Sequence, residues 1–242
     1  MRLMTPGRAE WRFSLNAFVI RRRNRDWLPR SDRDCSLGPR NRLDTPGGFT
    51  SSRRRGTTID MLIGLMGARG SGKTTVGRAL ARRLAVPFVD LDDVAISRFP
   101  ESSVRRVWQL RGESAWREAE TAALSESLDL HEAVIALGGG TPMIEAARRL
   151  LGTQRNLARV FLVYLRCDPA VLAERLKDPG DRPSLTGEHP AQEIAGVLAQ
   201  REPVYRELAD YEIAADRESP DELAAQITKV LSSRRSGPGA KR

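Results

Sequence analysis

The segment from Gly67 to Thr74 constrains the fold of this chain more than any other, because it has the pattern G-x-x-x-x-G-K-[S/T] of a phosphate-binding loop. The apolar run 61–66 precedes it, and residues 75–84 follow with apolar side chains at helical spacing. The loop is therefore expected to connect a buried strand to a helix, which is the context that the pattern requires. In that setting, backbone N–H groups and the positive end of the helix dipole surround phosphate oxygens. The sequence predicts a nucleotide-binding site here.

Two side chains of the loop have specific chemical tasks in this prediction. Lys73 would bridge the β- and γ-phosphates of ATP and act in catalysis, and Thr74 would bind Mg²⁺ through its hydroxyl. The predicted ATP-binding residues of this segment are Gly67, Gly70, Ser71, Gly72, Lys73, Thr74 and Thr75.

The positive charge of the chain is concentrated before the phosphate-binding loop. Residues 1–59 hold 14 arginines, no lysine and five acidic residues, which accounts for the whole formal net charge of +9. The remaining residues are neutral overall and give no electrostatic argument for nucleic-acid binding by the folded domain. We expect residues 1–58 to be a disordered extension, or to precede a true translation start near Met61. RNA binding by their arginine runs is a third interpretation.

Cysteine usage and hydropathy indicate where the protein works. The two cysteines, Cys35 and Cys167, have no metal-ligand spacing, and no apolar run approaches the roughly 18 residues of a membrane span. Both observations favour a protein of the reducing cytoplasm that does not enter a membrane.

Strand-like and helix-like segments alternate from Asp60 onward. The sequence predicts strands at 61–66, 86–93, 133–137, 160–165 and 211–213, and helices at 75–84, 113–128, 169–176, 191–209 and 220–231. This alternation predicts an α/β fold of three layers, α/β/α, with a five-stranded parallel sheet. We expect a P-loop domain at residues 59–232, a flexible basic tail at 233–242, and a mobile lid in the turn-rich stretch 177–187.

Chemically useful residues follow three of the predicted strands. The phosphate-binding loop follows the first, Asp90 and Asp92 end the second, and the glycines 138–140 follow the third. Ligands of open α/β sheets bind beyond the carboxyl ends of the strands. Two carboxylates on the same face of an extended strand would there hold Mg²⁺ and accept a proton from a substrate hydroxyl.

Several motifs in order resemble the shikimate kinase family. They are the P-loop, Asp90-Leu91-Asp92, Gly112-Glu113 with Trp116-Arg117, Gly138-Gly139-Gly140, Arg182-Pro183-Ser184-Leu185 and Arg201-Glu202-Pro203-Val204-Tyr205. The resemblance runs from about Met61 to Leu231 and does not extend to residues 1–58. It implies a monomeric kinase that transfers the γ-phosphate of ATP, with Mg²⁺, to the 3-hydroxyl of shikimate, in the pathway to chorismate and aromatic amino acids.

The resemblance also implies roles for single residues. Asp90 would lie on the Mg²⁺ side, and Asp92 would bind the substrate hydroxyl and act as the base. Arg117 and Arg201 would hold the substrate carboxylate, beside Gly138, Gly139 and Gly140. An alternative for Arg117 is a surface ion pair with Glu120, three residues further along its helix.

Three further residues are implied on the nucleotide side. Arg182, in the predicted lid, would move onto the phosphates and act in catalysis. Arg175 and Pro220 match positions that enclose adenine, although Arg175 also fits a charge on the surface of a helix.

One feature departs from the family pattern. Counted from Lys73, the acidic residue in the substrate position is Asp92, but counted back from Gly112 it is Asp93. We favour Asp92, because a strand joined to the sheet tolerates a shift in register least. Asp93 remains the second candidate.

Two other functions fit parts of the pattern. Another small P-loop kinase, for gluconate or a nucleoside monophosphate, would share the phosphate-binding loop. A non-catalytic, regulatory ATP-binding module would share the fold without turnover.

Overall fold

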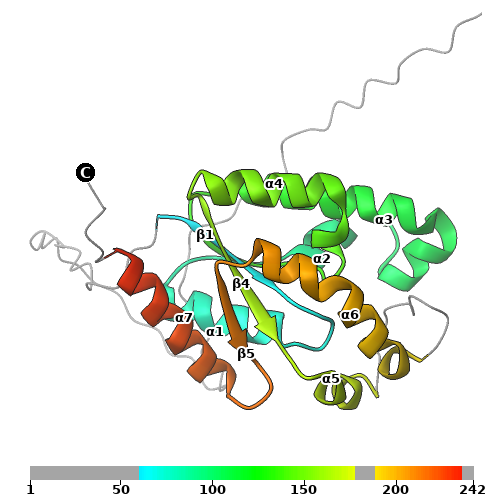
Figure 1. Ribbon diagram of the computed structural model, residues 1–242. Coiled ribbons are helices and arrows are strands. Elements are labelled where there is room, and N and C mark those ends of the chain that lie inside the picture. The colour runs from blue at the N-terminus through cyan, green and yellow to red at the C-terminus, as the bar shows by residue number, and fades with distance from the viewer. Residues whose placement is uncertain (1–59, 178–188, 236–242) are drawn as a thin grey trace, which may run out of the picture. The chain divides into compact units, whose positions relative to one another are not determined.

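The computed structural model describes residues 60–177 and 189–235 (Figure 1). Five strands form one sheet in the order β2-β3-β1-β4-β5, and every neighbouring pair is parallel. The strands are β1 (Leu62–Met66), β2 (Phe88–Asp90), β3 (Ala133–Ala136), β4 (Val160–Arg166) and β5 (Tyr211–Ala214). The predicted α/β class and the five parallel strands are confirmed.

Helices cover both faces of the sheet. They are α1 (Lys73–Leu84), α2 (Leu91–Ile96), α3 (Val104–Leu128), α4 (Glu145–Asn156), α5 (Pro169–Arg175), α6 (Pro190–Leu208) and α7 (Pro220–Arg235), with a 3-10 turn η1 at Thr141–Met143. Figure 1 shows α4 along one side of the sheet, with α1 and α7 along the other.

Alternating strand residues supply the two cores between these layers. In β1, Ile63 and Leu65 pack against α1 and α7, whereas Leu62 and Met66 pack against the side that α3, α4 and α6 cover. All four side chains are buried. A strand that is apolar on both faces is typical of a central strand in a doubly covered parallel sheet, and β1 has that position.

Helix α3 is interrupted at Gly112. Its φ of 84° and ψ of 168° lie far from helical values, so residues before and after it form two helical segments at an angle. Ser103 caps the first segment by accepting a hydrogen bond from the backbone N–H of Arg106. Trp116 and Leu124 of the second segment are buried, as the apolar spacing predicts.

The second strand is shorter than predicted, which changes the relation between two acidic residues. The strand ends at Asp90, and α2 begins at Leu91. Asp90 accepts a hydrogen bond from the backbone N–H of Asp92 at 3.2 Å and caps this helix. The prediction that Asp90 and Asp92 share one face of an extended strand is therefore wrong. Helix-capping by the aspartate explains why the chain turns there.

Two other boundaries also differ. Helix α4 was not predicted, and α7 continues past the predicted helix end at residue 231 to Arg235. Residues 1–58 and almost all of the predicted lid, with Arg182, lie outside the described residues.

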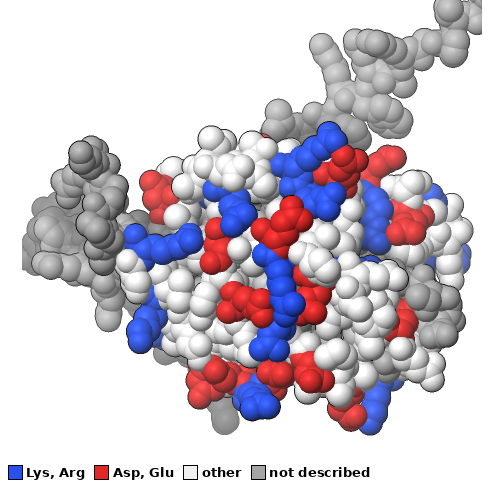
Figure 2. Space-filling model, in the orientation of Figure 1, with Lys and Arg blue, Asp and Glu red and all other residues white. Residues whose placement is uncertain are grey.

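The described surface carries charges of both signs. Figure 2 shows basic and acidic side chains interleaved over one face. This distribution fits the neutral charge balance that the sequence has after residue 59. None of the described helices combines the length and apolar composition that crossing a membrane requires.

Candidate active site

The phosphate-binding loop lies between β1 and α1 and borders a polar pocket. Lys73, the first residue of α1, donates hydrogen bonds from Nζ to the carbonyl oxygens of Gly67 at 3.0 Å and Ala68 at 2.8 Å. These bonds hold its ammonium group over the loop. The pocket is lined by Arg69, Gly70, Gly72, Lys73, Thr74, Thr75, Asp90, Asp92, Ala136 and Leu137. We name it the phosphate pocket.

Within the phosphate-binding loop, two predicted ATP-binding residues, Gly67 and Ser71, do not line the phosphate pocket. Gly67 contributes the carbonyl oxygen that holds Lys73. Ser71 is 1% exposed, and its hydroxyl oxygen is buried without a hydrogen-bond partner among the residues that the structure describes. Its side chain therefore belongs to the interior of the loop, and any contact with a phosphate would come from its backbone.

Thr74 and Asp90 form the polar edge of the phosphate pocket. The Thr74 hydroxyl donates a hydrogen bond to Oδ2 of Asp90 at 2.7 Å, although the two residues lie 16 positions apart. A hydroxyl and a carboxylate oxygen at this separation are hard oxygen ligands of the kind that Mg²⁺ prefers. Within the described residues, no group of three or more His, Cys, Asp and Glu side chains has metal-binding geometry.

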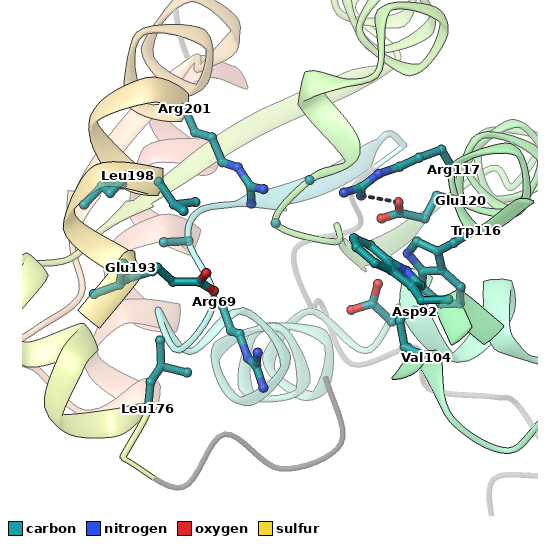
Figure 3. A pocket seen from close by; sticks show the side chains of 16 residues that line it. Arg69, Asp92, Val104, Trp116, Arg117, Glu120, Leu176, Glu193, Leu198 and Arg201 are labelled. Atoms are coloured by element: carbon teal, nitrogen blue, oxygen red, sulfur yellow. Dashed lines mark hydrogen bonds and ion pairs between the residues drawn. The ribbon is translucent and has the colours of Figure 1, made fainter. Parts of the chain in front are cut away.

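A second pocket adjoins the first, and we name it the acceptor pocket (Figure 3). Its walls come from α2, α3, α6, the end of α5, the phosphate-binding loop and the glycine-rich loop after β3. They are formed by Ala68, Arg69, Asp92, Val104, Trp108, Trp116, Arg117, Glu120, Gly139, Gly140, Leu176, Glu193, Ile194, Val197, Leu198 and Arg201. Arg69 and Asp92 line both pockets.

The two neighbouring aspartates of α2 have different surroundings. Asp92 is half-buried and reaches both pockets, whereas Asp93 is exposed and lines neither. This placement favours Asp92 over Asp93 as the residue that meets the substrate.

Arg117 and Arg201 approach the acceptor pocket from different helices. Figure 3 shows the guanidinium group of Arg117, from α3, and that of Arg201, from α6, turned toward one another across the pocket. Two such groups present several N–H donors to one anionic ligand.

Arg117 is held by two carboxylates. Its Nη1 donates to Glu120 at 2.7 Å, and its Nε and Nη2 donate to Glu113 at 3.0 and 2.9 Å. The predicted alternative of a pair with Glu120 is thus present, but Glu120 is 1% exposed and the pair lies at the pocket. Burial works to lower the pKa of Arg117, but its ion pairs with Glu120 and Glu113 raise the pKa overall.

Glu120 lines the acceptor pocket, although the sequence predicted it only as a surface ion-pair partner of Arg117. Its Oε1 accepts a hydrogen bond from the Thr141 hydroxyl at 2.9 Å, which ties α3 to the turn after the glycines. Burial raises the pKa of Glu120, against the opposing effect of Arg117. Its spacing of four residues from the buried Trp116 was the signal that it faces inward.

The glycine-rich loop brings backbone close to charged side chains. A Cβ at Gly138 would lie 2.5 Å from Oε1 of Glu120 and 2.8 Å from Oδ1 of Asp92, and a Cβ at Gly140 would meet the guanidinium of Arg117. Both positions therefore exclude side chains. Gly139 lies beside Arg201, with 3.7 Å from a built Cβ to Nη1.

Tyr205 is the aromatic residue of the motif that begins at Arg201, and it joins α6 to the glycine-rich loop. Its hydroxyl donates to the Gly139 carbonyl at 2.5 Å, and the side chain is fully buried. Burial raises the pKa of Tyr205 to about 12, so the phenol stays protonated and keeps this bond. The bond fixes α6, and with it Arg201, against the glycine-rich loop.

Arg175 lies at the nucleotide side of the loop. Its guanidinium donates to the carbonyl oxygens of Gly70 at 3.1 Å and Ala215 at 3.4 Å. It thus bridges the phosphate-binding loop and the segment after β5. Pro220 is the first residue of α7, beyond that segment, and lines neither pocket.

Comparison with known proteins connects this geometry to a family. The family model for shikimate kinase matches residues 69–232. A shikimate kinase of Rhodopirellula baltica is 36% identical over 173 residues, which cover 70% of this chain and 89% of the relative. Shikimate kinase 2 of Yersinia enterocolitica is 38% identical over 172 residues, covering 70% of this chain and 94% of the relative. The chain belongs to the shikimate kinase family.

Solved structures agree with this assignment. A shikimate kinase from Acinetobacter baumannii, solved in complex with shikimate, superposes with a TM-score of 0.66 and 31% identity. The match covers 72% of this chain and 94% of that structure. The protein is thus an ATP-dependent kinase, and the family resemblance drawn from its motifs is confirmed. Among the functions that the sequence left open, this assignment favours shikimate phosphorylation over the gluconate and nucleotide kinases.

Proposed function

We propose that this kinase transfers the γ-phosphoryl group of ATP to the 3-hydroxyl of shikimate, with Asp92 as the base at the junction of the two pockets. The observation that carries this proposal is that Asp92 lines both the phosphate pocket and the acceptor pocket. Phosphoryl transfer requires the attacking hydroxyl and the γ-phosphate to meet in line. A carboxylate that reaches both pockets can accept the hydroxyl proton at that meeting point.

The phosphate-binding loop would hold the ATP phosphates. The Lys73 ammonium group already lies at the loop, where it donates hydrogen bonds to the carbonyl oxygens of Gly67 and Ala68. When ATP binds, it would donate to oxygens of the β- and γ-phosphates instead. Thr74 and Asp90 would hold Mg²⁺, which supplies neutralisation of phosphate charge when it is bound. The short distance between their oxygens supports this assignment.

Arg117 and Arg201 would bind the carboxylate of the acceptor. Their guanidinium groups face one another across the acceptor pocket, and Asp92 lies in the same pocket beside Glu120, the ion-pair partner of Arg117 (Figure 3). Binding the carboxylate at one end fixes the distance and direction of the hydroxyl at the other. Gly138, Gly139 and Gly140 would allow the acceptor ring to approach the backbone.

Two further assignments concern arginines on the nucleotide side of the site. Arg175 would contact the adenine side of ATP, since it lies between the phosphate-binding loop and the segment that leads to Pro220. Arg182 would add positive charge at the γ-phosphate. We further propose that the enzyme is a cytoplasmic monomer.

A coupled assay of ADP release tests the proposal. MgATP is supplied with shikimate, gluconate or CMP in separate reactions. We expect turnover with shikimate alone, and a loss of about 10²–10⁴-fold in kcat for Asp92→Asn. Asp93→Asn is the matched control, since Asp93 is exposed and lines neither pocket, and it should stay within about threefold of wild type.

Two other outcomes of this assay would each contradict one part of the proposed function. Shikimate turnover that survives in Asp92→Asn and disappears in Asp93→Asn would move the base to Asp93. Nucleotide binding without turnover of any acceptor would favour a non-catalytic ATP-binding module.

A further inference from the structure

We propose that Trp108 is a positioning residue that holds the Arg117 guanidinium in its orientation toward the acceptor pocket. The Cζ atom of Arg117 lies 5.5 Å from the centroid of the Trp108 ring system, within the range of a cation–π interaction. Both side chains line the acceptor pocket. This inference rests on the proposed function, in which Arg117 binds the acceptor carboxylate.

The break at Gly112 creates this contact. Trp108 and Arg117 are nine residues apart in α3. In a continuous helix, nine residues correspond to a rise of about 13–14 Å and a rotation of roughly 180°, so the two side chains would point to opposite faces. The non-helical backbone of Gly112 turns the first segment of α3 so that the indole lies against the guanidinium.

The Trp108 indole restrains a motion of the Arg117 guanidinium that its hydrogen bonds to Glu113 and Glu120 do not restrain. Hydrogen bonds to Glu113 and Glu120 use three of the five N–H donors of Arg117 and leave one on each terminal nitrogen. Two such donors match the two oxygens of a ligand carboxylate. In-plane hydrogen bonds resist sliding of the guanidinium but resist tilting less. A ring stacked on its face resists the tilt.

The chemistry of Trp108 supports a specific role for its electron-rich face. Its Nε1 is buried and has no hydrogen-bond partner within the described part of the chain, which costs stability. A phenyl or aliphatic side chain could fill much of the same space without that cost. Of the aromatic side chains, the indole interacts most strongly with a cation. Stacking on Arg117 therefore explains why an indole stands at this position.

Steady-state kinetics of Trp108→Leu, Trp108→Phe, Arg117→Met and the double variant Trp108→Leu/Arg117→Met test the inference. We expect Trp108→Leu to raise the KM for shikimate about tenfold, with the KM for ATP and kcat within about twofold of wild type. Trp108→Phe, which keeps a ring face, should recover most of that loss. In the Arg117→Met background, Trp108→Leu should have no further effect, because the two residues act as one unit.

The double variant separates this inference from the proposed function. If Arg117→Met alone raises the KM for shikimate, and Trp108→Leu raises it tenfold again in that background, Trp108 is only a wall of the pocket and the inference is overturned. If Arg117→Met leaves the KM unchanged, the proposed role of Arg117 is wrong and the inference falls with it. Thermal unfolding identifies variants that do not fold. If Trp108→Leu is one of them, Trp108→Met takes its place in both backgrounds.

Discussion

At Gly138, one added methyl group would reach two carboxylates at once. The built Cβ lies within 2.8 Å of side-chain oxygens of both Glu120 and Asp92. Gly138→Ala should therefore displace the proposed base and lower kcat/KM for shikimate about 100-fold, since small misplacements at the reacting atoms have large effects. The KM for ATP should change less than threefold.

A glycine in open space provides the control for this substitution. Gly152 lies in α4, and a Cβ there meets nothing within 4 Å. Gly152→Ala should leave kinetics unchanged and stabilise the protein by about 0.5–1 kcal/mol. Equal kinetic losses in both variants would show that the effect of Gly138→Ala is not local.

Glu120 should make stability depend on pH in a defined direction. Because burial raises the pKa of Glu120 above its usual 4.5, the folded state binds this proton more tightly than the unfolded chain does. The contribution of the group to the free energy of unfolding is then fully present below about pH 4.5 and is lost as pH rises through the folded-state pKa. Urea unfolding from pH 4 to 8 measures this decline. The free energy of unfolding of wild type, minus that of Glu120→Gln, should fall as the pH rises.

The test uses the change with pH in the free energy of unfolding, and not the absolute stability of the Glu120→Gln variant. Glu118→Gln, with an exposed carboxylate on the same helix, is the control. A difference between wild type and Glu120→Gln that rises with pH would contradict the raised pKa.

The positions of residues in local motifs were predictable from the sequence, and contacts between distant segments were not. The P-loop pattern identified Lys73 and Thr74, and the hydrogen bond between Thr74 and Asp90 supports their joint prediction as metal ligands. The stacking of Trp108 on Arg117 depends on the break in α3 at Gly112, and sequence spacing does not encode this contact.

Among the elements, α3 depends on one backbone conformation. Gly112 has φ and ψ in a region that residues with a Cβ essentially do not occupy, while a Cβ there would meet nothing within 4 Å. Gly112→Ala should therefore act through backbone strain, lower the free energy of unfolding by about 1–3 kcal/mol, and raise the KM for shikimate. Urea unfolding and acceptor kinetics measure both effects.

Gly196 in α6 supplies the matched control for this helix. A Cβ at Gly196 also meets nothing within 4 Å, but its backbone lies within a helix. Gly196→Ala should be neutral or stabilising. If Gly112→Ala behaved in the same way, the break in α3 would not require glycine.

Elements with strong patterns were predicted, and elements with weak ones were missed. The apolar run 61–66 correctly predicted strand β1, and the helical spacing of residues 75–84 correctly predicted helix α1. Helix α4 buries only Ala147 and Leu151 and presents mainly polar residues, so its pattern is weak. The early end of β2 escaped prediction because Asp90 serves both as the last strand residue and as a helix cap.

For the whole molecule, the uneven charge distribution leads to a prediction about residues 1–58. All described site residues lie after residue 60, and the excess positive charge lies before it. Deleting residues 1–58 should leave kcat and both KM values within about twofold, because the residues that line the two pockets all come from the rest of the chain. Retention on a cation-exchange column should fall sharply.

The same pair of proteins tests the other interpretations of this segment. Salt-sensitive RNA retention by the full chain alone would support RNA binding by the arginine runs. A tenfold or larger loss of kcat on deletion would mean that the segment contributes to the kinase, and our view of it as dispensable would be wrong.

The shared wall between the two pockets has a consequence for inhibitor design. Because Arg69 and Asp92 border both the phosphate pocket and the acceptor pocket, ligands in the two pockets would approach one another at these two side chains. A single molecule that joins a nucleotide to a cyclic carboxylic acid through a short tether could occupy both pockets at once. Its second half would then bind at an effective concentration on the order of millimolar, without a new contact. The feature that lets two substrates react also makes the enzyme open to bisubstrate inhibition.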